Sequence, residues 1–332
     1  MMMSDSYSKL AAVGTNTASS RLVVAMNGWV DTPDSNGTAP DGMFGRKAII
    51  KTWLVTLNSE ELDFEFTVPF DDDTEANEAE IIVYNLSSET IDALRYNDNI
   101  TIEAGYGDDT GLIFSGYIVS VKSKWDGPDY VTTIKALDNF DLKERDIVER
   151  TYGAGTKASF ILNDLIWMLK IPCAVFSIRR DHTYKDEQKV SGGIMDNIRK
   201  YAEICGISVY INQGKIYARH LSEGDNINFT VSANTGMIES PEPFEEEVTA
   251  EDYTDVIKGY KVKMLLQHRL TTAAIVNLSF TKQWEKLGFN DNNKSKDGVV
   301  SSRKAKESGT YRVRSGKHTF NSSECITEVE VI

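Results

Sequence analysis

Leu62-Asp63-Phe64-Glu65-Phe66-Thr67-Val68 alternates apolar and polar side chains from end to end. A β-strand has a side-chain period of two, so Leu62, Phe64, Phe66 and Val68 fall on one face. The stretch therefore predicts a strand with one buried face, and the segments around it extend the pattern.

Strand patterns occur on both sides of this stretch. Ser87 or Ser88 can cap a short helix among them, in which Ile91 and Leu94 share a face. Six strands and one helix within residues 46–141 predict a small closed or nearly closed barrel. The other five strands are expected over Ile49–Leu57, Glu80–Asn85, Asn99–Ala104, Leu112–Val121 and Tyr130–Asp138.

Residues 142–222 have a different period. A first helix is expected over Lys157–Lys170, and a second helix is expected to end at Gly206, a residue type that favours the position after a helix. A hairpin follows, with strands over Ile207–Ile211 and Lys215–Arg219. These patterns predict a small α/β domain.

Residues 223–332 return to strand patterns, interrupted by an acidic loop over residues 239–247. The expected fold class is therefore α+β and mainly β, with β-rich regions over residues 46–141 and 223–332 that flank the α/β domain. The strands of the last part are expected over Phe229–Ser232, Asp255–Leu266, Ala273–Thr281, Thr310–Arg314 and Glu324–Ile332.

Two segments fall outside these domains. Residues 1–45 are rich in small polar residues and have one strand-like piece, Arg21–Met26, so an extended N-terminal arm is expected. Residues 282–308 predict a long polar loop within the last domain, either a solvated flap or a site that docks an acidic partner. The candidate docking residues of this loop are Lys282, Lys286, Lys294, Lys296, Arg303, Lys304 and Lys306.

The 332 residues have a formal net charge of −14, which repels phosphate backbones. Tight or sequence-specific nucleic-acid binding is therefore not expected, although a negative wall suits a conduit along which DNA moves without sticking. No apolar run approaches the length of a membrane span, and the start Met1-Met2-Met3-Ser4-Asp5 does not resemble a signal peptide. We expect a protein made and folded in a bacterial cytoplasm.

No pattern of catalytic, cofactor-binding or metal-binding residues emerges. Asp71-Asp72-Asp73-Thr74-Glu75 lacks the later Gly and Glu of a calcium loop, so a solvated acidic turn is expected there. Gly105-Tyr106-Gly107-Asp108-Asp109 joins two strands and is expected to be a hairpin turn instead of a phosphate cradle. Three cysteines and four histidines stand singly, without metal-ligand spacing.

Short motifs along the chain resemble those of phage baseplate and tail hub proteins, including the late control protein D group. Each motif is short, but their order and spacing cover residues 46–332. In the first domain the similar segments are residues 64–68, 77–87, 102–106 and 111–118; in the α/β domain, 193–198, 206–210 and 214–217; in the last domain, 235–241, 259–266 and 309–313 with His318.

The resemblance implies a structural role and no enzymatic activity. It also implies two tail-tube-like β-barrel domains, over residues 46–141 and 223–332, because the two barrels of one chain in this family resemble each other and the tail-tube subunit. Three chains of the family present six such barrels as a ring with a central channel. The implied hub joins a six-fold tube to a three-fold spike in the virion tail and passes DNA or effectors. The implied partners are two further copies of the chain, the tube protein, the spike protein, other baseplate proteins and the tape-measure protein.

The sequence also allows other functions. A hexameric tail-tube or distal-tail adaptor shares the structural class, whereas a tail-associated cell-wall hydrolase and a carbohydrate-binding β module do not. The scattered residues Trp53, Trp125, Trp167 and Trp284 do not suggest one aromatic platform for a carbohydrate, and Trp53 and Trp167 are expected in the core. The first and last domains are expected to meet neighbouring chains through strand edges, and a proline within Ile100–Ala104 is expected to block folding or assembly.

Overall fold

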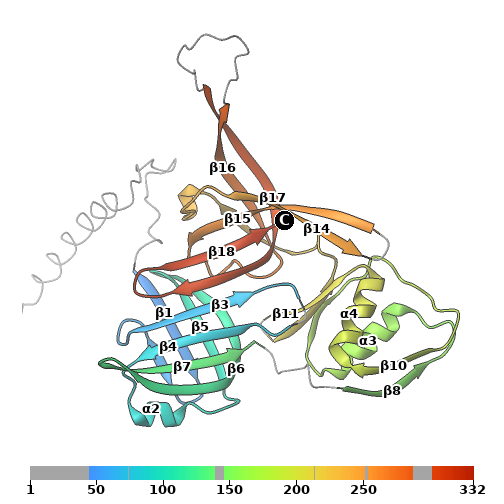
Figure 1. Ribbon diagram of the computed structural model, residues 1–332, viewed down its shortest axis with the longest axis horizontal. Coiled ribbons are helices and arrows are strands. Elements are labelled where there is room, and N and C mark those ends of the chain that lie inside the picture. The colour runs from blue at the N-terminus through green and yellow to red at the C-terminus, as the bar shows by residue number, and fades with distance from the viewer. Residues whose placement is uncertain (1–44, 74, 139–145, 213, 251–252, 287–300) are drawn as a thin grey trace, which may run out of the picture. The chain divides into compact units, whose positions relative to one another are not determined.

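The computed structural model describes residues 45–73, 75–138, 146–212, 214–250, 253–286 and 301–332. These residues are mainly β and include three α-helices, which confirms the expected mainly-β class (Figure 1). The predicted arm, apart from Gly45, lies outside the described residues. Within them, no helix is both long and apolar enough to cross a membrane.

The first β region consists of seven strands that pair in the order β3-β4-β7-β6-β5-β1-β2. Alternate residues of these strands form one apolar cluster, which includes the Phe64, Phe66 and Val68 of the deciding stretch. The path is open, and no closed barrel is found among the described residues. The strands are β1 (Arg46–Thr52), β2 (Thr56–Asn58), β3 (Phe64–Phe70), β4 (Glu78–Tyr84), β5 (Asn99–Tyr106), β6 (Asp109–Asp126) and β7 (Asp129–Leu137).

The short helix α2 (Ser88–Ala93) lies between β4 and β5, as predicted. The Ser87 side chain accepts a hydrogen bond from the Thr90 backbone N–H, so Ser87 is the N-cap. Leu94, the residue after the helix, is buried in the first cluster, and Ile91 packs against it.

The prediction of a single strand over Ile49–Leu57 is wrong. These residues form an antiparallel hairpin in which Lys51 pairs with Thr56. The Thr52 and Val55 backbones close a turn whose tip is Trp53 and Leu54, so the prediction of a buried Trp53 is wrong: its side chain is 87% exposed. An apolar turn tip lacks the Gly, Pro or Asn that would mark it in a sequence.

Residues 100–104, which were expected to contribute to strand-edge contacts between chains, do not lie at a sheet edge. β5 pairs with β1 on one side and with β6 on the other, so a proline there would break pairing inside the sheet. The outermost strands of the described residues are instead β2 in this region and β13 and β14 in the last region.

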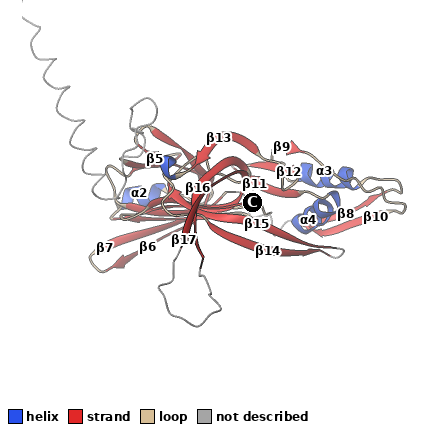
Figure 2. Cartoon of the chain, turned by 90° about the horizontal axis from the view of Figure 1, so that it is seen from above, coloured by secondary structure: helices blue, strands red, loops and turns tan. Residues whose placement is uncertain are grey.

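The middle region has its own apolar cluster, formed by two helices and two small sheets. Figures 1 and 2 both show α3 (Ala158–Met168) and α4 (Ile194–Cys205) side by side. Gly206 ends α4 in the left-handed conformation with φ 66°, as its position predicts. The strands are β8 (Asp146–Tyr152) paired with β10 (Gln188–Gly193), and β9 (Cys173–Phe176), β12 (Lys215–Arg219) and β11 (Ser208–Asn212).

Trp167 is not a core residue of this region. The buried stripe of α3 includes Ile161, Leu162 and Leu165, whereas Trp167 and Phe160, seven residues apart, share the outer face. The Trp167 side chain is 78% exposed. An exposed tryptophan next to a buried stripe cannot be told from a core residue by helical periodicity alone.

The last β region extends the sheet of the first region. Strand pairing starts at Glu242 inside the predicted acidic loop, and the predicted 282–308 loop is strand at both ends, because β16 reaches Lys286 and β17 begins at Ser301. The strands are β13 (Asp225–Val231), β14 (Glu242–Ala250), β15 (Tyr253–Leu265), β16 (Ala274–Lys286), β17 (Ser301–Phe320) and β18 (Cys325–Val331), with a 3-10 turn at Ala233–Thr235.

β17 connects the two β regions. Its first part pairs with β16, and its last part pairs with β18 on one side and β3 on the other. His318 lies opposite Val68 and Phe320 opposite Phe66, so the stretch that starts the first core also receives the last region. The apolar clusters cross the same line, since the first includes Phe320 and the third includes Phe70.

Gly116 pairs with Ile100 of β5 and directly precedes Tyr117, at which β6 changes its pairing partner from β5 to β7. A Cβ atom here would lie 2.1 Å from the Leu137 carbonyl oxygen, a backbone atom that cannot move without breaking the sheet. We expect Gly116→Ala to lower the free energy of unfolding by about 2 kcal/mol. Gly153→Ala is the matched control because nothing lies within 4 Å of its added Cβ. Chemical denaturation measures both, and equal stabilities would contradict the close approach.

Candidate functional site

Five of the seven predicted basic docking residues lie on one hairpin, β16–β17. Its backbone register pairs Thr281 with Lys306, Gln283 with Lys304 and Trp284 with Arg303. By strand alternation, Lys282, Lys286 and Arg303 occupy register positions of one face, and Lys304 and Lys306 occupy positions of the other. Lys294 and Lys296 lie outside the described residues. The hairpin thus gathers five of the seven residues but divides them between two faces.

A buried ion pair, missed by the sequence analysis, lies where the two β regions meet. Arg312 Nη1 donates to Asp72 Oδ2 at 2.8 Å, and Arg312 Nε donates to the Glu223 carbonyl at 3.0 Å. The two side chains are only 4% and 11% exposed. The prediction of a solvated acidic turn is therefore wrong for Asp72. Arg312 connects β17 both to Asp72, just after β3, and to Glu223, which precedes β13.

Further polar contacts join the same two regions. Arg269 donates two hydrogen bonds to the Asp109 carboxylate at 2.6 and 2.8 Å, a bidentate geometry that fixes orientation as well as distance. Arg46 donates to the carbonyls of Asn321 and Ser322. The Tyr106 hydroxyl donates to the buried Cys325 carbonyl at 2.6 Å. These partners are far apart in sequence, so no local pattern indicates them.

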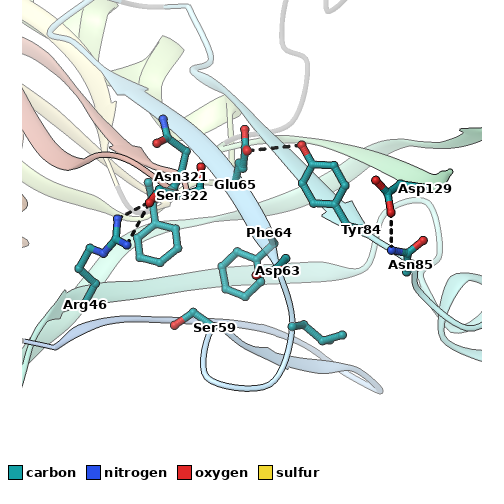
Figure 3. Close-up of a pocket in the computed structure, with 12 residues that line it drawn as sticks. Arg46, Ser59, Asp63, Phe64, Glu65, Tyr84, Asn85, Asp129, Asn321 and Ser322 are labelled. Atoms are coloured by element: carbon teal, nitrogen blue, oxygen red, sulfur yellow. Dashed lines mark hydrogen bonds between the residues drawn. The ribbon is translucent and has the colours of Figure 1, made fainter. Parts of the chain in front are cut away.

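The hydrogen bonds of Arg46 border a polar cavity of about 400 Å³ (Figure 3). Its side chains bond to one another, since Tyr84 donates to Glu65 and Asn85 donates to Asp129. Neither a histidine nor a cysteine lines it. The lining residues are Arg46, Ser59, Leu62, Asp63, Phe64, Glu65, Tyr84, Asn85, Asp129, Phe320, Asn321 and Ser322.

Two other carboxyls near the junction have raised pKa values. Burial raises the pKa of Asp71 and of Asp138 to about 6, and in both groups the charges of neighbouring aspartates add to the shift. Asp138 accepts hydrogen bonds from the backbone and side-chain nitrogens of Asn77, which anchors the start of β4 to the end of β7. Across the described residues, no three His, Cys, Asp or Glu side chains are placed to hold a metal ion.

Two histidines are packed into the junction. His318 of β17 is fully buried, with Nδ1 2.8 Å from Thr327 Oγ1 and its ring 4.9 Å from the Phe70 ring. Burial lowers the pKa of His318 to about 3, and the nearby His268 contributes in the same direction. The His268 ring lies against Gly111, where a Cβ would approach to 2.2 Å of the ring. Burial lowers the pKa of His268 as well. Both rings therefore fill space between the regions, and burial favours their neutral form.

We expect Asp72→Asn to lower the free energy of unfolding by about 3 kcal/mol, because it leaves the Arg312 charge buried without a counter-ion. Asp73→Asn is the matched control: Asp73 is the adjacent aspartate and is exposed. We expect that control to stay within about 0.5 kcal/mol of wild type. Urea denaturation measures both variants. Equal, small effects would show that the ion pair does not hold the regions together.

His318 should make the protein acid-sensitive. Its folded-state pKa is depressed, so its stabilisation is present above the unfolded value near 6.5 and is lost as the pH falls toward 3. Asp71 and Asp138 act in the opposite sense, because raised carboxyl pKa values favour the folded state at low pH. The quantity to measure is therefore the difference between wild type and His318→Asn.

Between pH 6 and 4, we expect wild type to lose about 1.4 kcal/mol per pH unit relative to His318→Asn. Denaturant titrations at several pH values test this. A difference that does not change with pH would contradict the assignment, whatever the size of the variant's packing defect.

Known proteins match the chain in family and in fold. The family model described as Baseplate hub gp41 matches residues 74–280, more than half of the chain. None of the curated protein sequences compared with the chain matches it significantly.

Three solved structures share the fold at low sequence identity. The 43 kDa tail protein of prophage MuSo2 from Shewanella oneidensis aligns with a TM-score of 0.55 at 6% identity, over 86% of this chain and 97% of that one. A tail protein from Neisseria meningitidis MC58 gives 0.56 at 8%, over 87% and 96%. The E. coli c3393 protein, a component of the type VI secretion system, gives 0.51 at 8%, over 85% and 76%.

The family match covers parts of all three regions described above, and the structural likenesses extend over most of the chain. The chain therefore belongs to the Baseplate hub gp41 family of phage tail and baseplate structural proteins.

Proposed function

We propose that this protein is a homotrimeric hub of a tail baseplate that joins the six-fold tail tube to the three-fold spike and lines the channel between them. The observation that carries the proposal is the family match over residues 74–280. Its partners in the virion tail are the tube, the spike, other baseplate proteins and the tape-measure protein.

Three apolar clusters support the domains of this proposal. One lies mainly in residues 46–141, one in 142–222 and one mainly in 223–332. We propose that the first and last β regions form tube-like barrels once neighbouring chains complete them. The ion pair, the bidentate contact and the shared strand β17 hold these two regions at a fixed angle. A subunit that sets the geometry of a ring needs that rigidity.

The described surface also supports assembly. The outermost strands β2, β13 and β14 offer backbone groups to a neighbour. Large apolar side chains are exposed at Trp53, Leu54, Trp125 and Trp167. Exposed aromatic residues are frequent anchors of protein interfaces. The net charge of −14 suits a channel wall that DNA passes without binding.

The oligomeric state tests the proposal. We expect light scattering of the purified chain at micromolar concentration to give three times the mass of one chain. We also expect the trimer to bind the tube and spike proteins of the same tail. A hexamer would favour a tube-like or distal-tail adaptor. A stable monomer that binds neither partner would contradict the hub.

A further inference from the structure

Two hairpins of the last β region extend beyond the strands that support them. We call residues 242–250 of β14 with 253–259 of β15 the acidic ribbon, and residues 281–286 of β16 with 301–308 of β17 the basic ribbon. No third strand pairs with either ribbon within the described residues, since β18 pairs with β15 only from Tyr260 onward. An isolated two-stranded ribbon is marginally stable in water, so both gain from a partner.

The acidic ribbon contains five carboxylates and one lysine, a net charge of −4. Two of its carboxylates have ion pairs in the same chain, Glu245 with Lys258 and Glu246 with Arg314. The Glu245 and Glu246 side chains nevertheless remain 64% and 48% exposed, and Glu242 is exposed as well. Negative charge therefore faces solvent along the outer strand of the sheet.

The basic ribbon has the opposite character. It contains five cations and two carboxylates, a net charge of +3 in a chain of −14. Its base is fixed to β15: the Tyr260 hydroxyl donates to Glu307, and the Tyr260 ring packs against Phe280, which is buried. Next to this base, Thr281 and Lys306 are exposed.

The two ribbons of one chain do not pair with each other. No strand pairing links β14 or β15 to β16 or β17 within the described residues, and Figures 1 and 2 show the hairpins running in different directions. Because the two oppositely charged ribbons of one chain point in different directions, they are better placed to contact two different molecules than each other.

We propose that the basic ribbon of one copy docks on the acidic ribbon of the next copy, which closes the ring head to tail. This inference rests on the proposed homotrimer and names its contact. Copies with a charge of −14 repel one another, and a local attraction between unlike patches both offsets that repulsion and selects the orientation. A contact between two different surfaces repeats around a ring until the ring closes.

Charge exchange tests the contact. Lys304→Glu/Lys306→Glu alters the basic ribbon, and Glu242→Lys/Glu245→Lys alters the acidic one. We expect each pair alone to raise the trimer dissociation constant by roughly ten-fold or more at low salt, and the four changes together to restore it. Circular dichroism checks that each variant is folded. In wild type, raising the salt from about 0.05 to 0.5 M should weaken the trimer because it screens exposed charges.

Lys122→Glu/Lys124→Glu is the matched control. These two lysines are exposed, two residues apart on β6, and their reversal makes the same change in net charge. We expect the control to assemble like wild type. If both ribbon variants assemble normally, or if the four changes fail to restore a weakened trimer, the contact is wrong although the hub stands. If wild type itself is monomeric at every salt concentration, the proposed hub is wrong as well.

Discussion

The pairing of β3 with β17 is the constraint on which the rest of the structure depends. β3 contributes its apolar face to the first cluster and its backbone to the last region, so one strand serves two cores. Around this seam, the Arg312–Asp72 pair, the Arg269–Asp109 pair and the Arg46 hydrogen bonds connect residues that the sequence separates by 160 to 276 positions. A shift of one residue in this register would turn every β3 side chain to the opposite face.

The energetics of the seam differ from those of the cores. The clusters are stabilised by apolar burial, which tolerates small shifts, whereas a buried ion pair is favourable only in a narrow geometry. Neutral His318 and His268 fill the remaining space between the regions. The ion pair therefore fixes the orientation of the two regions in addition to its effect on stability.

Local pattern accounts for much of the fold. The Ser87 cap and Gly206 each reflect chemistry within a few residues, and both predictions are confirmed. The strand predicted over Leu62–Val68 is also found, but it begins two residues later, since β3 runs from Phe64 to Phe70. The errors also have physical causes. The apolar tip at Trp53 looks like strand interior, and β8 and β10 have little apolar alternation and were not predicted. The role of Asp72 was beyond sequence reasoning, because its partner is 240 residues away and a carboxylate in an acidic run looks solvated.

The make-up of the first apolar cluster has a consequence for synthesis on the ribosome. Leu266, Phe320 and Cys325 belong to that cluster, whereas its other buried members all lie between Ala48 and Ala136 in the sequence. A nascent chain therefore cannot complete its first core until some 190 further residues have emerged. Until then its apolar face stays open to chaperones and to premature partners. Folding of the start is thus coupled to translation of the end, so only a chain translated past residue 325 can offer finished surfaces to the assembling tail.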